Sequence, residues 1–317
     1  MWKKIIAAVG CSVLLWGGSS AYAADDQQTA MTVYRDAYMA RLHDDRAANT
    51  NIDLFGPNYH WELNADGQVL RNGSMHWHGE MSWDFTDQKT NATSHEDIPF
   101  YVEQRDNLLI LYIQRENTWS KMSLPGVSPE LIASWNNGTV DLFNDSMQAI
   151  KRVSLEHDTD KMQGLRIVMD VGKMLQVTNK YLDESKGKRS SEKRQAQQEA
   201  YAEMAQGLMG TELTVDWVVD KTTHQTITVS VDLTPFIRGY AQHILNEMAA
   251  GKIKLNDEER AMMESLGYFS ELKFYMTYLG VKQNINLTVP EEVRKSAEDM
   301  MNMKDIQKGV SDAAKKS

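Results

Sequence analysis

The sequence predicts an α+β protein built on an antiparallel sheet. One amphipathic segment comes first, and most later segments alternate between apolar and polar residues. Side chains point alternately to the two faces of a strand, so such alternation indicates strands with one buried face. Two longer helical stretches interrupt the alternation. Helices and strands therefore occur in separate runs, as is typical of α+β folds.

The amphipathic segment covers residues 29–48. Its apolar residues Met31, Tyr34, Tyr38 and Leu42 recur at spacings of three and four. This spacing places them on one face of a helix. The sequence thus predicts a helix that packs one side against the sheet.

Seven later segments are predicted strands, and all but the second show the period of two: NYHWELNADGQVL, LLILYIQ, GLRIVMDV, ELTVDWVVD, ITVSVDL, LKFYMTYL and QNINLTV. In the first of these, Asp66-Gly67 is a hairpin turn signal. The second is apolar on both faces, as a strand covered on two sides would be. In the third, the alternation continues from Leu165 to Val171, which predicts a strand to that point.

Three stretches interrupt the sheet. Residues 128–135 resemble a short helix, residues 180–209 begin as a charged linker and end as a helix, and residues 235–268 form a second helical insert. In the last, Thr234 is an expected cap and Pro235 stands in the first turn. The chain from Pro290 is again helical, and residues 299–317 form a polar tail.

The first 23 residues predict export. Lys3 and Lys4 precede an apolar run, and Ala21-Tyr22-Ala23 offers a cleavage site, so residues 1–23 have the form of a secretory signal peptide. The expected mature protein is periplasmic or otherwise extracytoplasmic, and has no transmembrane segment. The alternative is a lipoprotein anchored to the membrane through Cys11.

Composition excludes several classes of site. Cys11 is the only cysteine, so cleavage after Ala23 would remove disulfides, thiol catalysis and cysteine-ligated zinc. The formal net charge of −10 becomes −12 once Lys3 and Lys4 are removed. This charge argues against nucleic acid and anionic lipid surfaces as partners. The 19 methionines are flexible apolar fillers, typical of an irregular core or of an adaptable pocket.

The stretch SMHWHGEMSWDF at residues 74–85 raises the question of a metal site. As a strand, it places Met75, Trp77, Met81 and Trp83 on one face, and His76, His78 and Glu80 on the other. Two histidines about 7 Å apart, with a carboxylate nearby, could bind a metal ion. A water-exposed strand face explains the same pattern, and it is the interpretation we adopt, with no cofactor expected. His60 and His95 could join a site only through the fold.

Other catalytic signals are weak. The chain has no nucleophile elbow, no H-E-x-x-H motif and no phosphate-binding loop. No nucleophile, base and orienting group stand together in the sequence. The sequence therefore favours a protein without catalytic activity.

The order of these segments resembles the superfamily of the periplasmic lipoprotein carrier of Gram-negative bacteria. The resemblance rests on the opening helix, the long meander, the hairpin DWVVDKTTHQTITVSVDL and the closing run from Val289 to Val293. Within the hairpin, Trp217 followed by Asp220-Lys221-Thr222 is similar to a strand–turn–strand of that family. The family fold is a strongly curved antiparallel sheet, an unclosed half-barrel, with helices covering its concave face. The resemblance implies one such domain over residues 24–298.

In that fold the concave face binds apolar ligands. The resemblance implies the following candidate lining residues: Trp61, Met75, Trp77, Met81, Trp83, Met169 and Trp217. The lid would be the apolar stripe of the 235–268 insert, with Phe236, Tyr240, Ile244 and Met248 as candidates. An ordinary core and a permanently packed helix would show the same residues.

Three functions remain open from the sequence. The first, which the resemblance favours, is a non-catalytic carrier in the bacterial envelope that binds a lipid or the acyl chain of a lipidated protein. The second is an interaction or regulatory module of the same fold with a filled core and an envelope protein as its partner. The third is a metal-dependent enzyme that uses His76, His78 and Glu80.

Overall fold

The computed structural model describes residues 24–41, 46–55, 59–69, 75–86, 92–105, 108–125, 144–184, 199, 202–266, 271–278 and 287–299. The expected signal peptide, the short helix at 128–135, most of the charged linker and the tail beyond residue 299 lie outside these residues.

The described strands are β1 (Arg46–Phe55), β2 (Tyr59–Val69), β3 (Met75–Thr86), β4 (Thr93–Arg105), β5 (Leu108–Arg115), β6 (Thr118–Pro125), β7 (Ile150–Asp158), β8 (Met162–Asp170), β9 (Glu212–Asp220), β10 (Thr226–Asp232), β11 (Glu271–Tyr278) and β12 (Glu298–Asp299). The helices with described bounds are α2 (Ala24–Arg41), α5 (Val171–Glu184), α7 (Thr234–Ala249), α8 (Asp257–Leu266) and α9 (Glu291–Ser296), and residues 144–146 and 202–207 are also helical.

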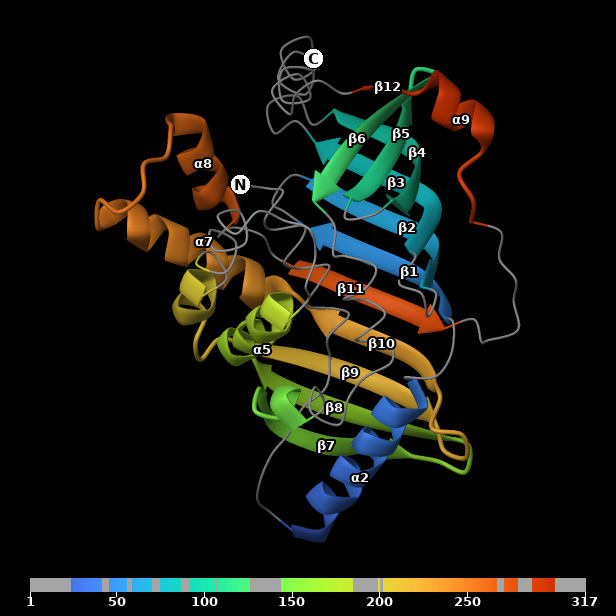
Figure 1. Cartoon of the computed structure of the whole chain (residues 1–317), viewed down its shortest axis with the longest axis vertical. Coiled ribbons are helices and arrows are strands. Elements are labelled where there is room, and N and C mark those ends of the chain that lie inside the picture. Colours follow the sequence, from blue (N-terminus) through green and yellow to red (C-terminus); the bar gives the residue numbers. More distant parts are fainter. Residues whose placement is uncertain are drawn as a thin grey trace.

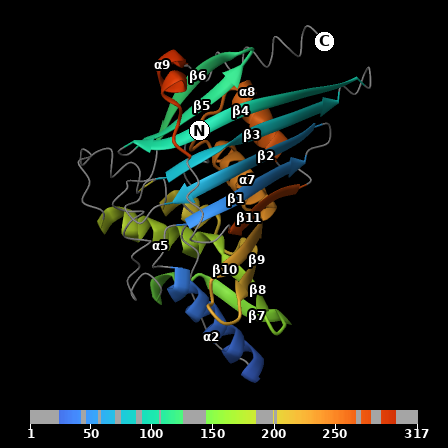
Figure 2. The same cartoon turned by 90° about the vertical axis from the view of Figure 1, so that its right-hand side faces the viewer.

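All of these strands belong to one 12-stranded sheet in the order β12-β6-β5-β4-β3-β2-β1-β11-β10-β9-β8-β7. Neighbouring strands are antiparallel, except that the short β12 runs parallel to β6. The edge strands β12 and β7 do not pair with each other, so the sheet stays open (Figure 1). Figure 2 shows the strand direction turning between β1–β4 and β7–β9. The predicted α+β fold with an unclosed antiparallel half-barrel is confirmed.

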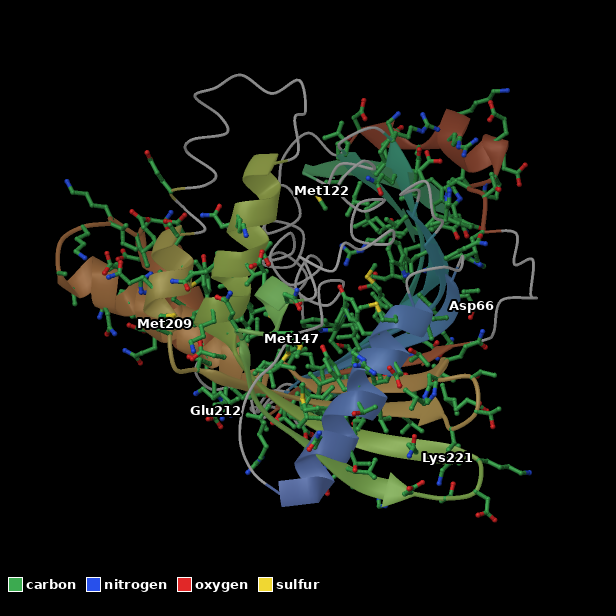
Figure 3. All side chains as sticks on the ribbon, turned by 60° about the horizontal axis from the view of Figure 1, so that its bottom comes forward. Asp66, Met122, Met147, Met209, Glu212 and Lys221 are labelled. Carbon is green, nitrogen blue, oxygen red and sulfur yellow. The ribbon has the colours of Figure 1, made fainter. Side chains whose placement is uncertain are left out.

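The strand register places most of the large apolar side chains of β2, β3 and β8–β11 on one face of the sheet. Trp61 lies opposite Trp83, and Leu63 lies opposite Met81. Across the next pairs, Val231 faces Val215 and Val215 faces Ile167. We call this apolar side the inner face. Figure 3 shows Met122 on the inner side of the sheet and Asp66 on the opposite, outer side.

Helices close the inner face over β7–β10. Tyr34 of α2 meets Trp217 of β9 edge to face, with 5.6 Å between ring centroids. Buried residues of α5 and α7, among them Leu175 and Phe236, join the same core cluster. α7 begins after β10 and continues beyond the ends of the strands, with α8 packed along it (Figure 1). The main hydrophobic core therefore lies on this half of the sheet.

The other half carries its helix on the outer face. Val289 and Val293, from the segment that contains α9, are buried against Tyr112 of β5, with Tyr101 of β4 and Trp119 of β6 packed alongside. The predicted two-sided burial of the LLILYIQ segment holds only in part: Tyr112 is buried on the outer side, whereas Leu109, Leu111 and Ile113 on the inner side are partly buried and Leu108 is exposed. The expectation that the helices cover only the concave face does not hold for α9.

Several boundaries differ from the sequence prediction. The first helix ends at Arg41 rather than at residue 48, because the helical period stops and the alternating run AANTNIDLF begins β1. The alternation through Val171 is also interrupted. Asp170 accepts a hydrogen bond from the backbone N–H of Lys173 at 3.1 Å, and α5 begins at Val171. Residues 180–184 end this helix and are not part of a linker.

Two predictions from local sequence signals were wrong, one of a turn and one of a helix cap. Asp66-Gly67 lies inside the continuous strand β2. Thr234 makes no capping hydrogen bond at the start of α7; its hydroxyl instead accepts the backbone N–H of Leu272 in β11 at 2.8 Å. The expected helical insert at 235–268 corresponds to α7, which begins one residue earlier at Thr234, and to α8, and residues 221–225 of the hairpin join β9 to β10.

Candidate functional site

The inner face of β2 and β3 carries the most prominent group of large apolar side chains that stay partly accessible. Trp61, Trp77, Met81 and Trp83 are all partly buried. Trp61 and Trp83 stand directly opposite each other on neighbouring strands. Directly paired side chains contact each other across a sheet. The side chain of the fifth candidate on these strands, Met75, lies outside the described residues.

Gly67 is part of this surface. It pairs with Trp77, and a Cβ atom at Gly67 would stand 2.2 Å from the indole Nε1 of Trp77. The indole therefore lies across the backbone of β2, in the space that a side chain at Gly67 would fill. This contact fixes the ring against the sheet instead of leaving it free in solvent.

The other two lining candidates lie elsewhere, in the closed half. Met169 and Trp217 are 2% and 3% exposed and belong to the main core. The indole N–H of Trp217 donates to the hydroxyl of Thr226 at 3.0 Å, and its ring meets Tyr34. The seven lining candidates thus divide into a partly open group on β2 and β3 and an enclosed pair on β8 and β9.

The lid candidates lie on one face of α7. Phe236 and Tyr240 are buried in the core, Ile244 packs against it, and Met248 is partly buried. Burial raises the pKa of Tyr240 above its usual value. The apolar stripe is therefore packed in this structure, and movement as a lid remains a prediction.

The two histidines of the His76-x-His78-x-Glu80 pattern lie on the outer face, as predicted. His78 and Glu80 are exposed, and the His78 ring stacks on Tyr101 with centroids 4.5 Å apart. His76 is only partly exposed, near Glu103 and Arg294, and burial lowers its pKa. Among the described residues, these three do not bring potential ligand atoms together, whereas another group does. The water-exposed interpretation thus fits His78 and Glu80 better than it fits His76.

That other group is Asp53, His60 and Glu62, on the outer face of β1 and β2. One ligand atom from each lies within 4.8 Å of the others. The group continues along a row of ion-pair contacts. His60 stands between Asp53 and Asp84, and His95 stands between Asp84 and Asp97. His95 Nδ1 lies 2.7 Å from Asp84 Oδ1, and its Nε2 lies 3.1 Å from Asp97 Oδ1.

These contacts favour the protonated form of the His95 ring. Hydrogen bonds to Asp84 and then to Asp97 raise the pKa of His95, because both carboxylates favour the protonated ring. The hydroxyl of Ser82 donates to Asp97 at 2.7 Å, and this contact and His95 lower the pKa of that carboxyl. The fold joins His60 and His95 through Asp84, but not to His76 or His78. No local sequence pattern predicts this row, because its members stand on four different strands.

A second polar cluster lies beneath α9. The Glu103 carboxylate is 2% exposed and accepts hydrogen bonds from the Tyr112 hydroxyl at 2.8 Å and from Arg294 at 2.7 Å. Arg105 approaches the same carboxylate at 2.7 Å. Burial, together with Glu103, raises the pKa of Tyr112 to about 12. The buried charge is thus paired, as a buried carboxylate must be to avoid a large desolvation cost.

No known protein family and no curated protein matches the sequence. Among solved structures, the fold is similar to that of LprF from Mycobacterium bovis, with a TM-score of 0.39 and 8% sequence identity over 84% of this chain and 99% of that chain. Similarity this distant assigns neither a family nor a function. Within the described residues, no helix is long and apolar enough to cross a membrane.

Proposed function

We propose that the protein binds a lipid, the acyl chain of a lipidated protein or another apolar ligand on the inner face of β1–β6, as a non-catalytic protein of the bacterial envelope. One observation carries the proposal. The large apolar side chains of β2 and β3 are only partly buried, whereas those of β8 and β9 are enclosed by α2, α5 and α7.

The chemistry of this surface suits an acyl chain. Trp61, Trp83 and Met81 present adjacent rings and a flexible thioether, and Glu96 of β4, which pairs with Arg115, lies directly opposite Trp83 at the edge of this group. Removing each CH₂ group of a chain from water contributes about 0.8 kcal/mol. Thioethers adapt to chains of different shape, and this favours a ligand class rather than one ligand.

A fluorescent fatty acid, cis-parinaric acid, tests the proposal when it is titrated into the mature protein. We expect saturable binding and a change in tryptophan emission. Trp83→Ala should weaken binding about tenfold, because the loss of roughly 1.5 kcal/mol of apolar burial corresponds to that factor. The matched control is Tyr275→Ala, which removes an aromatic ring that is 39% exposed on the outer face. Binding should be unchanged in this variant.

The outcome separates the proposed function from its nearest alternative. Failure of the wild-type protein to bind any amphiphile would contradict the carrier, and so would equal weakening by both variants. The interaction module would then be the better account. Its supporting observation is the complete enclosure of Met169 and Trp217, which shows how the same fold fills its own core.

A further inference from the structure

We propose that Asp53, His60 and Glu62 form a binding site for a divalent transition metal ion, with zinc as the best fit, on the outer face of β1 and β2. This site is independent of the proposed apolar surface, which lies on the opposite face of the same sheet. It also differs from the His76-x-His78-x-Glu80 pattern in which the sequence suggested metal binding.

The distances within the group suit a small ion. Ligand atoms at about 2.0–2.1 Å from a tetrahedral zinc ion lie roughly 3.3 Å from each other. The Nε2 atom of His60 is 3.3 Å from Oδ1 of Asp53. The carboxylate of Glu62 brings the third ligand atom within 4.8 Å of both. A small movement of the Glu62 side chain would complete a three-ligand set with a position open to solvent.

The strands explain why these side chains converge. Asp53 and Glu62 are directly paired in the β1–β2 ladder, and His60 is two residues from Glu62 on the same face of β2. A regular ladder brings such neighbours together without any loop. The ligands therefore stand on rigid elements, whereas a site built from loops would have to be ordered by the metal itself.

The surroundings of His60 orient its ring for metal binding. Its other nitrogen, Nδ1, faces Oδ2 of Asp84 at 3.6 Å. Phe55 stacks on the ring with centroids 4.4 Å apart and planes 7° from parallel. Metal-binding histidines usually direct their free N–H to a carboxylate, which fixes the ring and raises its basicity. Asp84 stands where that acceptor is needed.

The carboxylate ligands are arranged in a similar way. The side-chain amide of Asn51 donates to Oε1 of Glu62 at 2.7 Å, which holds that carboxylate on the outer face. The basic residue paired with Asp53 across the sheet is Lys273, which forms an ion pair with Glu271. Asp53, Glu62 and Asp84 thus place three carboxylates around one imidazole, and a dication would offset their repulsion.

The donor set narrows the identity of the ion. An imidazole nitrogen with two carboxylates suits zinc and its first-row neighbours, and it disfavours calcium and magnesium, which prefer oxygen ligands alone. For one set of ligands, affinity generally rises from manganese to copper and falls again at zinc, which still binds more tightly than manganese. Zinc should therefore bind more tightly than manganese, and calcium should not compete.

Isothermal titration of the chelator-treated mature protein with zinc chloride tests the site. We expect one saturable site, lost in His60→Ala and in Glu62→Gln. Asp84→Asn should weaken binding by about 10–100-fold, because it removes the negative charge behind the His60 ring and leaves the three ligands in place. The matched control is His78→Ala, which removes an exposed outer-face histidine of β3 outside the group. Its affinity should equal that of the wild type.

A second measurement identifies the ligands directly. Cobalt(II) bound in place of zinc should give visible absorption bands that His60→Ala abolishes and His78→Ala preserves, with circular dichroism confirming that both variants fold. The alternative is that His60 is held between Asp53 and Asp84 without any metal. Absence of stoichiometric zinc binding would favour that alternative and overturn the proposal, as would binding that survives His60→Ala.

Discussion

Gly67 shows how one residue can be misread from sequence and explained by structure. Beside Asp66 it is a turn signal, yet it lies within the strand β2. A glycine suits this position because the Trp77 indole occupies the space that a side chain would fill. We expect Gly67→Ala to cost about 1–3 kcal/mol of stability, since the new methyl group must displace the ring. The control is Gly164→Ala in β8, where the added Cβ would meet His157 at 3.4 Å. Urea melts would compare the two; equal stabilities would show that the indole moves freely.

His95 is the residue whose charge state the outer face controls most clearly. Hydrogen bonds to Asp84 and Asp97 raise its pKa, so NMR titration in chelating buffer should find it above 6.5. Its ion pairs therefore stabilise the fold fully below pH 6.5, and this contribution is lost as the pH rises through the raised value. Asp97→Asn should lower the His95 pKa, and Asp66→Asn, opposite His78, should leave it unchanged. A His95 pKa that ignores Asp97→Asn would contradict the contact.

At the scale of elements, α9 is attached to the sheet by one buried ion pair and a small apolar cluster. Arg294 donates to Glu103, which is buried under the helix. Removing one partner of a buried pair leaves a charge without compensation. Because Arg105 also contacts Glu103, Arg294→Ala should cost about 2–3 kcal/mol rather than more.

Lys295 provides the matched control for this helix. Its side chain is 76% exposed and pairs with Glu291 at 3.5 Å. Exposed pairs contribute about 0–1 kcal/mol, so Lys295→Ala should be nearly neutral in the same urea melts. If the two variants lost similar stability, the Glu103 cluster would not be what holds α9 to β4–β6.

At the scale of the whole molecule, the alternating pattern predicted which side chains of a strand share a face. It did not predict which strands lie next to each other. The division of residues 74–85 into an apolar and a polar face holds in β3, because the period of two is a local property of the chain. The row from Asp53 through His60, Asp84 and His95 has no such local trace. Strand order decides it, and strand order depends on contacts between distant segments. The position of α9 on the outer face has the same origin.

The candidate lining residues show the same limit. Trp83 and Trp217 have the same apolar, alternating surroundings in the sequence, yet one is partly accessible and the other is 3% exposed. The difference arises from α2, whose Tyr34 covers Trp217. No pattern around either tryptophan could show which of them the helix covers. The sequence therefore identified the side of the sheet, but it could not distinguish enclosed from accessible positions.

The contrast between the two halves of the sheet predicts a difference in local stability. All four strands β2, β3, β8 and β9 have strand neighbours on both sides, but helices cover the inner face of β8 and β9, whereas the large inner-face side chains Trp61, Trp77, Met81 and Trp83 of β2 and β3 are only partly buried. Segments with fewer buried apolar contacts open at lower free energy. Native-state hydrogen exchange should therefore show stronger protection of the amides in β8 and β9 than in β2 and β3.

A ligand on the inner face should reduce that difference. Anything that binds the folded state alone stabilises it, and the effect is greatest where the ligand suppresses local opening. Saturation with cis-parinaric acid should raise protection in β2 and β3 much more than in β8 and β9, and Trp83→Ala should diminish the gain. Uniform protection in the free protein would contradict the division of the sheet. A ligand effect confined to β8 and β9 would place apolar binding in the half of the sheet that the helices close.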